Sequence, residues 1–139
     1  LISNIDADTD AFNAVLNAHR MPANTDSQIN SRNKAILSTM KEATNIPFST
    51  LKCCREIMDL AIESAEDGNP NSVSDAGVAG ELGSAGARGA ALNVLINLKD
   101  IDDKIFCKEM ESKTSALVKE VYELLQILRK IVNGKLKNG

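Results

Sequence analysis

Apolar positions recur at three- and four-residue spacings along most of the chain, which is the pattern of amphipathic helices. We expect five helices, at about residues 6–18, 25–44, 47–66, 72–98 and 104–133. No segment shows a convincing alternation of apolar and polar residues, so no strand is expected. The predicted fold is all-α: an antiparallel helical bundle of about five helices with a Gly/Ala-rich central helix, forming one domain over residues 1–139.

Local chemistry sets the predicted boundaries between these helices. Thr25 suits the cap of the second helix. Pro47 is expected to end that helix, because proline disfavours helix at the residue before it, and to stand in the first turn of the third. Asp102 or Asp103 is expected to cap the last helix, and Gly134 is expected to end it.

The stretch from Gly68 to Leu98 is the least ordinary part of the chain. It opens with turn residues, and Ser72 and Asp75 then stand in the Ser-x-x-Asp spacing that starts a helix. Glycine recurs at every third position: Gly77, Gly80, Gly83, Gly86 and Gly89. Each interior glycine costs a helix about 1 kcal/mol relative to alanine. The flattened face that results is expected either to pack tightly against another helix or to leave a bare wall for a flat ligand.

The composition of the chain argues against several classes of binding partner and site. A net charge of −3 and an aromatic content of 3% argue against a broad nucleic-acid surface. No apolar run approaches the roughly 20 residues of a membrane span. Cys53, Cys54 and Cys107 lack Cys-x-x-Cys spacing, so neither a zinc site nor a disulfide framework is indicated, and a cytoplasmic setting is expected.

Isolated polar residues have ordinary explanations. His19 is the only histidine, and at the end of the first helix it suits the negative end of the helix dipole. Asp6, Asp8 and Asp10 are expected near the start of that helix, where acidic residues suit the positive end. The long apolar stripe of the last helix fits a second subunit as well as it fits the chain's own core. We therefore expect a homodimer or a higher homo-oligomer.

Several segments together resemble the cyclodeaminase/cyclohydrolase family of folate enzymes, whose domain forms the C-terminal part of formiminotransferase-cyclodeaminase. The segments that carry the resemblance are Gly68-Asn69-Pro70-Asn71-Ser72 followed by Ser74-Asp75, the small-residue helix, Asn93-Val94-x-x-Asn97-Leu98, Asp6-x-Asp8-x-Asp10-Ala11-Phe12, Met21-Pro22 and the Pro47 helix start. Family members carry an earlier helical segment with a proline- and glycine-rich loop. This sequence has no counterpart to it, so an N-terminally truncated domain is expected.

The resemblance implies chemistry on a one-carbon unit carried by tetrahydrofolate, with no cofactor beyond this substrate and no metal. In formimidoyltetrahydrofolate cyclodeaminase, the anilino nitrogen of formiminotetrahydrofolate attacks the formimino carbon, the ring closes to methenyltetrahydrofolate, and ammonia leaves. Methenyltetrahydrofolate cyclohydrolase is the enzyme alternative, and a non-catalytic helical oligomerisation module is the alternative from another class. An associated or fused formiminotransferase would place the chain in histidine breakdown.

The resemblance also implies roles for particular residues. Asp75 would supply the carboxylate near the reacting carbon. Asn69, Ser74, Asn93 and Asn97 would bind polar groups of the folate, because amides pair naturally with a heterocycle edge. Arg88 is a candidate partner for the glutamate carboxylates of the substrate. A first-turn or capping role for Asp75 and a solvated helix face for Arg88 remain the structural alternatives.

Overall fold

A computed structural model describes residues 2–138 as four α-helices and one short 3₁₀ helix. In chain order these are α1 (Ile2–His19), α2 (Asp26–Asp67), η1 (Pro70–Ser72), α3 (Val73–Leu98) and α4 (Lys104–Asn138). Those residues contain no strand, and the predicted all-α class is confirmed. The helix count is four rather than the expected five, because the second and third predicted helices are one.

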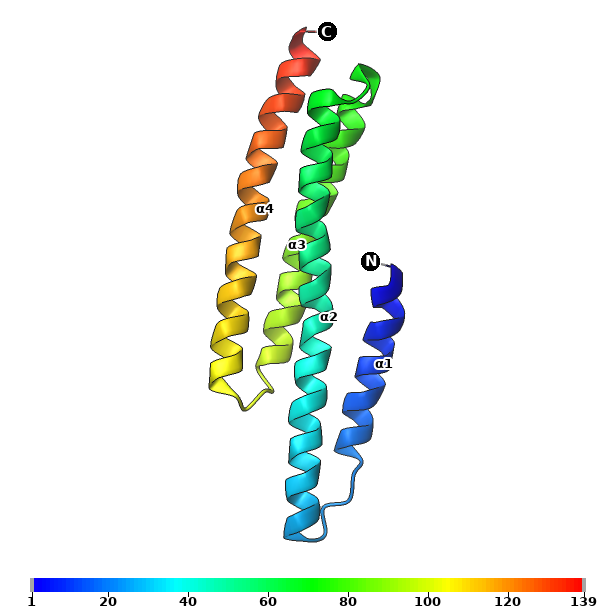
Figure 1. Cartoon of the computed structure of the whole chain (residues 1–139), viewed down its shortest axis with the longest axis vertical. Coiled ribbons are helices and arrows are strands. Elements are labelled where there is room, and N and C mark those ends of the chain that lie inside the picture. The colour runs from blue at the N-terminus through cyan, green and yellow to red at the C-terminus, as the bar shows by residue number, and fades with distance from the viewer. Residues whose placement is uncertain (1, 139) are drawn as a thin grey trace.

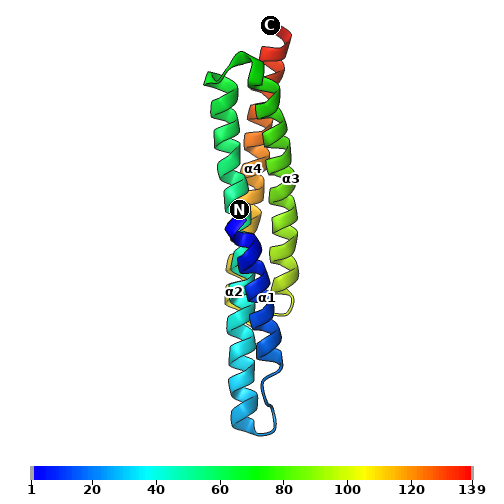
Figure 2. The same cartoon turned by 90° about the vertical axis from the view of Figure 1, so that its right-hand side faces the viewer.

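The helix α2 is the longest element, with 42 residues, and the other helices pack along different parts of it. The helices α3 and α4 pack beside its C-terminal half, while α1 runs antiparallel to its N-terminal half (Figures 1 and 2). Below the turn between α3 and α4, α1 and α2 continue alone as a hairpin (Figure 1). The main core lies where α2, α3 and α4 meet, and its most deeply buried side chains include Leu51, Met58, Val121 and Leu128. No helix among residues 2–138 has the length and apolarity needed to cross a membrane.

Pro47 lies inside α2 and does not end it, so the predicted break was wrong. Proline has no N–H for the helical bond that residue 47 would donate to the Ala43 carbonyl. The side-chain amide of Asn97, on α3, donates to that carbonyl instead, at 3.4 Å. A bond from the neighbouring helix thus replaces the one that proline removes.

Exchanging Asn97 for Leu should lower the free energy of unfolding by about 1–2 kcal/mol, because the Ala43 carbonyl loses its donor. In a Pro47→Ala background the N–H of residue 47 can bond to that carbonyl, so the same exchange should cost clearly less. Urea denaturation of the four variants gives the coupling between the two positions. An equal cost in both backgrounds would show that the Asn97 bond does not compensate for Pro47.

The other helix ends confirm some expectations and correct others. Thr25 caps α2, its hydroxyl accepting from the N–H of Gln28 at 3.3 Å. Ser72 precedes α3 but makes no capping bond, because the 3₁₀ turn holds its backbone near φ −102° and ψ 8° rather than extended. Gly134 does not end α4, since the helix runs on and Lys135 donates to the Glu66 carbonyl at the end of α2, at 2.5 Å.

The predicted place of the three N-terminal aspartates was also wrong. The helix α1 begins at Ile2, so its first turn holds no acidic residue. Asp6, Asp8 and Asp10 lie farther along the helix, all exposed, beyond the turn where the dipole attracts carboxylates most. His19 does stand in the last turn of α1, as expected.

Asp103 caps α4, as predicted, and also joins α4 to α2. One carboxylate oxygen accepts from the N–H groups of Ile105 and Phe106, at 3.1 and 3.0 Å. The other lies 2.6 Å from Nζ of Lys41. The hydrogen bond from Lys41, followed by that from the Phe106 N–H, lowers the pKa of Asp103 below its ordinary value of 3.8.

This lowered pKa predicts a pH dependence of stability. The contribution of Asp103 is fully present above the ordinary pKa of 3.8 and is lost as the pH falls through the lower folded-state value. An Asp103→Asn variant should therefore melt at a lower temperature than the natural protein at neutral pH, with the difference shrinking in acid. The neighbouring exposed Asp102, changed to Asn, serves as the control. A melting difference that does not vary with pH would exclude the ion pair as its source.

The glycine face of α3 is mostly a packing surface. A Cβ added at Gly80 would stand 2.0 Å from Cδ2 of Leu128, and one at Gly83 would stand 3.2 Å from Cγ2 of Ile57. Gly89 differs, since a Cβ there would meet no atom within 4 Å. Close packing therefore explains Gly80 and Gly83, and Gly89 alone of these three leaves open space.

Candidate functional site

A groove of about 1030 Å³ runs between α3 and α4. Arg88 lines it, together with Gly89 and the alanines beside them on α3. Tyr122 and Lys119 line it from α4. The groove thus combines apolar walls with cationic groups, and the predicted residue Arg88 is one of these.

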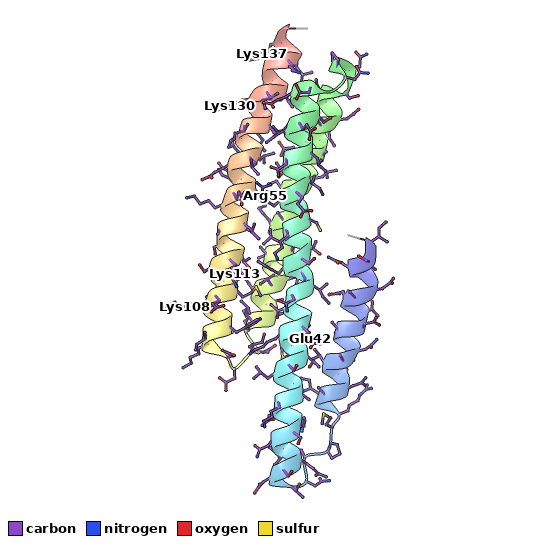
Figure 3. The ribbon with its side chains drawn as sticks, viewed as in Figure 1. Glu42, Arg55, Lys108, Lys113, Lys130 and Lys137 are labelled. Carbon is purple, nitrogen blue, oxygen red and sulfur yellow. The ribbon has the colours of Figure 1, made fainter. Side chains whose placement is uncertain are left out.

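An ion pair crosses this groove toward the C-terminus of α4. The guanidinium of Arg129 donates to both carboxylate oxygens of Glu81, from Nε at 2.6 Å and from Nη2 at 2.8 Å. This bidentate contact lowers the pKa of Glu81. On the α2 side of the bundle, Arg55, which is labelled in Figure 3, donates to Glu120 of α4 at 2.7 Å. Two arginine–carboxylate pairs therefore join α4 to α2 and to α3. The ion pair to α3 links the two helices that form the walls of the groove.

One buried polar group of the groove has no partner. Thr114 lines the groove from α4, is 2% exposed, and its hydroxyl makes no hydrogen bond. Threonine in a helix normally bonds a carbonyl of the preceding turn, as Thr44 does to Met40 at 2.8 Å. The wall of the groove therefore contains a hydroxyl, that of Thr114, without a hydrogen-bond partner.

A second hollow, of about 570 Å³, lies where α1, α2 and α3 meet. Ile5, Ile46, Pro47 and Ala90 are among its apolar walls, and Asn93 lines it from α3. Asn97 lies one turn further along α3 and is engaged with the Ala43 carbonyl, so its amide serves packing in this chain. Of the two predicted asparagines on α3, Asn93 is the one that lines this hollow.

The polar residues from α1 in this second hollow were not singled out as site residues by the sequence. Asn4 donates to the hydroxyl of Thr50 at 3.0 Å, and the hydroxyl of Thr9 donates to the Ile5 carbonyl at 3.3 Å. Asp8 also lines the hollow and makes no side-chain hydrogen bond among residues 2–138. The Asp-x-Asp-x-Asp segment was the available signal: it is part of the family resemblance, but its carboxylates were interpreted through the helix dipole.

The turn before α3 holds the remaining predicted residues. Asn69 accepts from the N–H of Asn71 at 3.0 Å, which shapes the turn. Ser74 lines a hollow of about 480 Å³ between α3 and the end of α4. Asp75 lies in the first turn of α3, is exposed, and makes no side-chain hydrogen bond among the described residues. Its carboxylate is therefore free, whatever benefit its position brings to the helix dipole.

These predicted residues do not converge within one chain. Asp75 and Asn93 are 18 positions apart on a continuous helix, which separates them by about 27 Å along its axis. Arg88 faces the groove toward α4, whereas Asn93 faces the hollow toward α1. One chain thus presents three separate parts of the predicted site.

The cysteines lie away from these hollows. Cys54 is buried in the core, and burial raises the pKa of its thiol. Cys53 and Cys107 are half-buried, and all three thiols are free. Residues 2–138 hold no cluster of three or more side chains suited to a metal ion.

Comparison with known proteins gives concordant matches. The family model described as formiminotransferase-cyclodeaminase matches residues 1–116. A methenyltetrahydrofolate cyclohydrolase of Methylorubrum extorquens is 40% identical over 129 residues, which cover 93% of this chain and 62% of that protein. The formimidoyltransferase-cyclodeaminase of Rattus norvegicus is 34% identical over 120 residues, covering 86% of this chain and 22% of that protein.

A solved structure shares the fold. The formiminotetrahydrofolate cyclodeaminase of Thermotoga maritima superposes with a TM-score of 0.81 at 25% identity, covering 96% of this chain and 63% of that one. The chain thus spans less than two thirds of each of these relatives.

Proposed function

This chain belongs to the formiminotransferase-cyclodeaminase family, and from that premise we propose that it is a formimidoyltetrahydrofolate cyclodeaminase. The reaction joins the anilino nitrogen of formiminotetrahydrofolate to the formimino carbon, with loss of ammonia. The match over residues 1–116, together with the names of the relatives, carries this proposal.

The reaction needs three functional groups from the protein. A base takes the proton from the attacking nitrogen, an acid protonates the departing amine, and an anion stabilises the amidinium-like cation. We assign the anion to the Asp75 carboxylate, whose oxygens have no internal hydrogen bond among the described residues. Asn93 and Arg88 would bind other parts of the folate, since each lines a hollow large enough for a small molecule.

Methenyltetrahydrofolate cyclohydrolase is the second candidate. The 40% identity to a protein of that name supports it, and water rather than an amine then reacts at the same carbon. Both reactions need similar contacts to the folate, so the hollows above serve either.

Two parallel assays test the function. The protein is mixed with formiminotetrahydrofolate while ammonia and the methenyl absorbance are recorded, and separately with methenyltetrahydrofolate while loss of that absorbance is recorded. Ammonia release coupled to methenyl formation supports the cyclodeaminase, and enzyme-dependent loss of methenyl supports the cyclohydrolase. A folded protein that accelerates neither reaction and binds no reduced folate, such as folinic acid, by calorimetry would contradict both.

A further inference from the structure

The groove between α3 and α4 has a volume of about 1030 Å³, at the upper end of the range of small-molecule sites. Among the described residues, those that line it all belong to these two helices. The helices run side by side and antiparallel from the turn that joins them (Figure 1). Its outer side is therefore open to a ligand that arrives from solvent.

The groove is cationic, although the chain as a whole has a net charge of −3. Its charged lining residues are Glu81, Arg88, Lys119 and Arg129. Arg129 is neutralised by its bidentate contact with Glu81. Arg88 takes part in none of the ion pairs among the described residues, and Lys119 has a contact of 3.8 Å with the exposed Glu123. Two positive charges are therefore available to an anionic ligand.

The groove suits a carboxylate better than a phosphate. A guanidinium such as that of Arg88 pairs with a carboxylate through two parallel hydrogen bonds. Phosphate sites commonly add the free N–H groups of a helix N-terminus. The groove instead runs along the interiors of α3 and α4, where the backbone N–H groups are already bonded within each helix.

The ion pair between Glu81 and Arg129 gives a reference point along the groove. Arg88 lies seven residues from Glu81 on α3, and Tyr122 lies seven residues from Arg129 on α4, so each is about 10 Å from the ion pair along its helix. Because the helices are antiparallel, both displacements run in the same direction. Arg88 and Tyr122 therefore lie at the same level on opposite walls.

The buried hydroxyl of Thr114 lies farther along the groove in that direction. Thr114 is fifteen residues from Arg129, or about 22 Å, which is about 12 Å beyond the level of Arg88. Leu95 lies at nearly the same level on the facing wall. The Thr114 hydroxyl has no hydrogen-bond partner, as described above. The groove thus has a free cation at one point and an unpaired hydroxyl about 12 Å away.

The walls between these two points are apolar and suit a flat body. Ala91, Leu92 and Val118 are among the residues that line them. A Cβ at Gly89 would meet no atom within 4 Å, so the wall of α3 has open space there. Tyr122 is 60% exposed and presents an aromatic ring, which packs well against another aromatic ring. An aromatic ligand therefore fits these walls better than a branched aliphatic one.

We propose that this groove binds a free aromatic carboxylate with a hydroxyl at the end opposite its carboxylate. The carboxylate pairs with Arg88, the rings lie between Tyr122 and the open wall at Gly89, and the hydroxyl bonds to Thr114. A hydroxyl matches Thr114 because both groups donate and accept hydrogen bonds. Threonine in a helix has two accessible χ1 rotamers, and the ligand selects the one that turns the hydroxyl into the groove.

This site does not depend on the folate activity proposed above. A folate whose glutamate end lay at Arg88 would compete with the aromatic carboxylate for the same guanidinium. The groove would then make the proposed enzyme sensitive to aromatic carboxylates, and a protein without folate activity would still bind them.

The first test combines two ligands with two proteins. One ligand is a naphthoate with a hydroxyl on the ring far from its carboxylate, and the other is the naphthoate without that hydroxyl. By calorimetry the natural protein should bind the hydroxynaphthoate about fivefold more tightly, the usual effect of one hydrogen bond. Thr114→Val should bind the two ligands equally. No binding at millimolar concentration, or the same preference in both proteins, would overturn the proposal.

Two controls separate this effect from damage to the fold. Thr39→Val removes a hydroxyl that donates to the Ala35 carbonyl on α2, and it should keep the fivefold preference. Thr114→Val should melt at or above the temperature of the natural protein, because it removes a buried hydroxyl that lacks a partner. A clearly lower melting temperature would show that this hydroxyl is bonded in the free protein, and would overturn its role in the site.

The second test addresses the carboxylate. Arg88→Gln should raise the dissociation constant of the hydroxynaphthoate at least about tenfold, since the charged pair is lost. The corresponding naphthamide, which has no charge, should bind the natural protein and Arg88→Gln with the same low affinity. Arg20→Gln, at an exposed position after α1, is the matched control and should bind the hydroxynaphthoate as the natural protein does. An unchanged affinity in Arg88→Gln would overturn the proposal.

The third test distinguishes a free aromatic carboxylate from the end of a folate. Aminobenzoylglutamate carries the carboxylates of the folate but no hydroxyl for Thr114, so it should bind more weakly than the hydroxynaphthoate. Tighter binding of aminobenzoylglutamate, lost in Arg88→Gln, would assign the groove to the folate and overturn the proposal. None of the three tests uses turnover, so the proposed function can fail in its own assays while these measurements still decide the site.

Discussion

Replacing Asp75 with Asn is expected to lower kcat about 10²–10⁴-fold in whichever folate assay the protein supports, the range typical of losing a group that moves a proton or stabilises charge. Asparagine has the same shape but no charge and no basic oxygen. Asp75 makes no side-chain hydrogen bond among the described residues, so the fold should be little affected. The measurement is kcat by ammonia release or by methenyl absorbance, beside a thermal melt.

Asp100 supplies the control for this substitution. It is exposed in the turn between α3 and α4, and Asp100→Asn removes the same charge from the chain. Its kcat should stay near that of the natural protein. If Asp75→Asn keeps full turnover, the carboxylate serves only the helix dipole, whose loss would cost about 0.3–1 kcal/mol of stability.

Adding one methyl group at Gly80 is expected to destabilise the protein by about 1–3 kcal/mol, even though alanine is the better helix former. The new Cβ would stand 2.0 Å from Cδ2 of Leu128, a side chain that is 1% exposed and so has little room to move. The same change at Gly89 meets open space and should stabilise by about 0.5–1 kcal/mol. The two variants should therefore differ by about 1.5–4 kcal/mol in urea denaturation.

A second-site change tests the cause of the Gly80 effect. Leu128→Val removes the Cδ atoms that the new methyl would meet, so the double variant should lose less stability than the sum of the two single variants. If the losses are additive, the cost of Gly80→Ala does not come from its contact with Leu128. Equal effects at Gly80 and Gly89 would likewise contradict the packing explanation.

Helix boundaries that depend on neighbouring residues could be predicted from the sequence, whereas those that depend on distant residues could not. Apolar spacing predicted the helical class, and the Thr25 and Asp103 caps were predictable because each bonds within its own first turn. The breaks predicted at Pro47 and Gly134 were wrong because the contacts found at these points come from residues far away in the sequence. Asn97 of α3 donates to the Ala43 carbonyl that Pro47 leaves without a helical donor, and Lys135 of α4 donates to a carbonyl at the end of α2.

The candidate site shows the same division. Residue chemistry and the family resemblance pointed to Arg88 and Asn93, and both line hollows. The sequence could not show that they face different hollows, nor that Asp8 of α1 lines the same hollow as Asn93. Which face of α3 meets which neighbour depends on packing between helices far apart in the sequence. The roles of Asp75, Asn69 and Ser74 remain predictions.

The hairpin of α1 and the first part of α2 gives the protein two levels of stability. Ala18 is the one buried residue that the described part of α1 contributes, and the buried residues of α2 begin only at Thr44. With so little apolar area to lose, the hairpin should open without the main core, as a separate cooperative unit. Amide hydrogens of residues 26–43 should then exchange with solvent far sooner than those of residues 51–65, although both segments belong to one continuous helix.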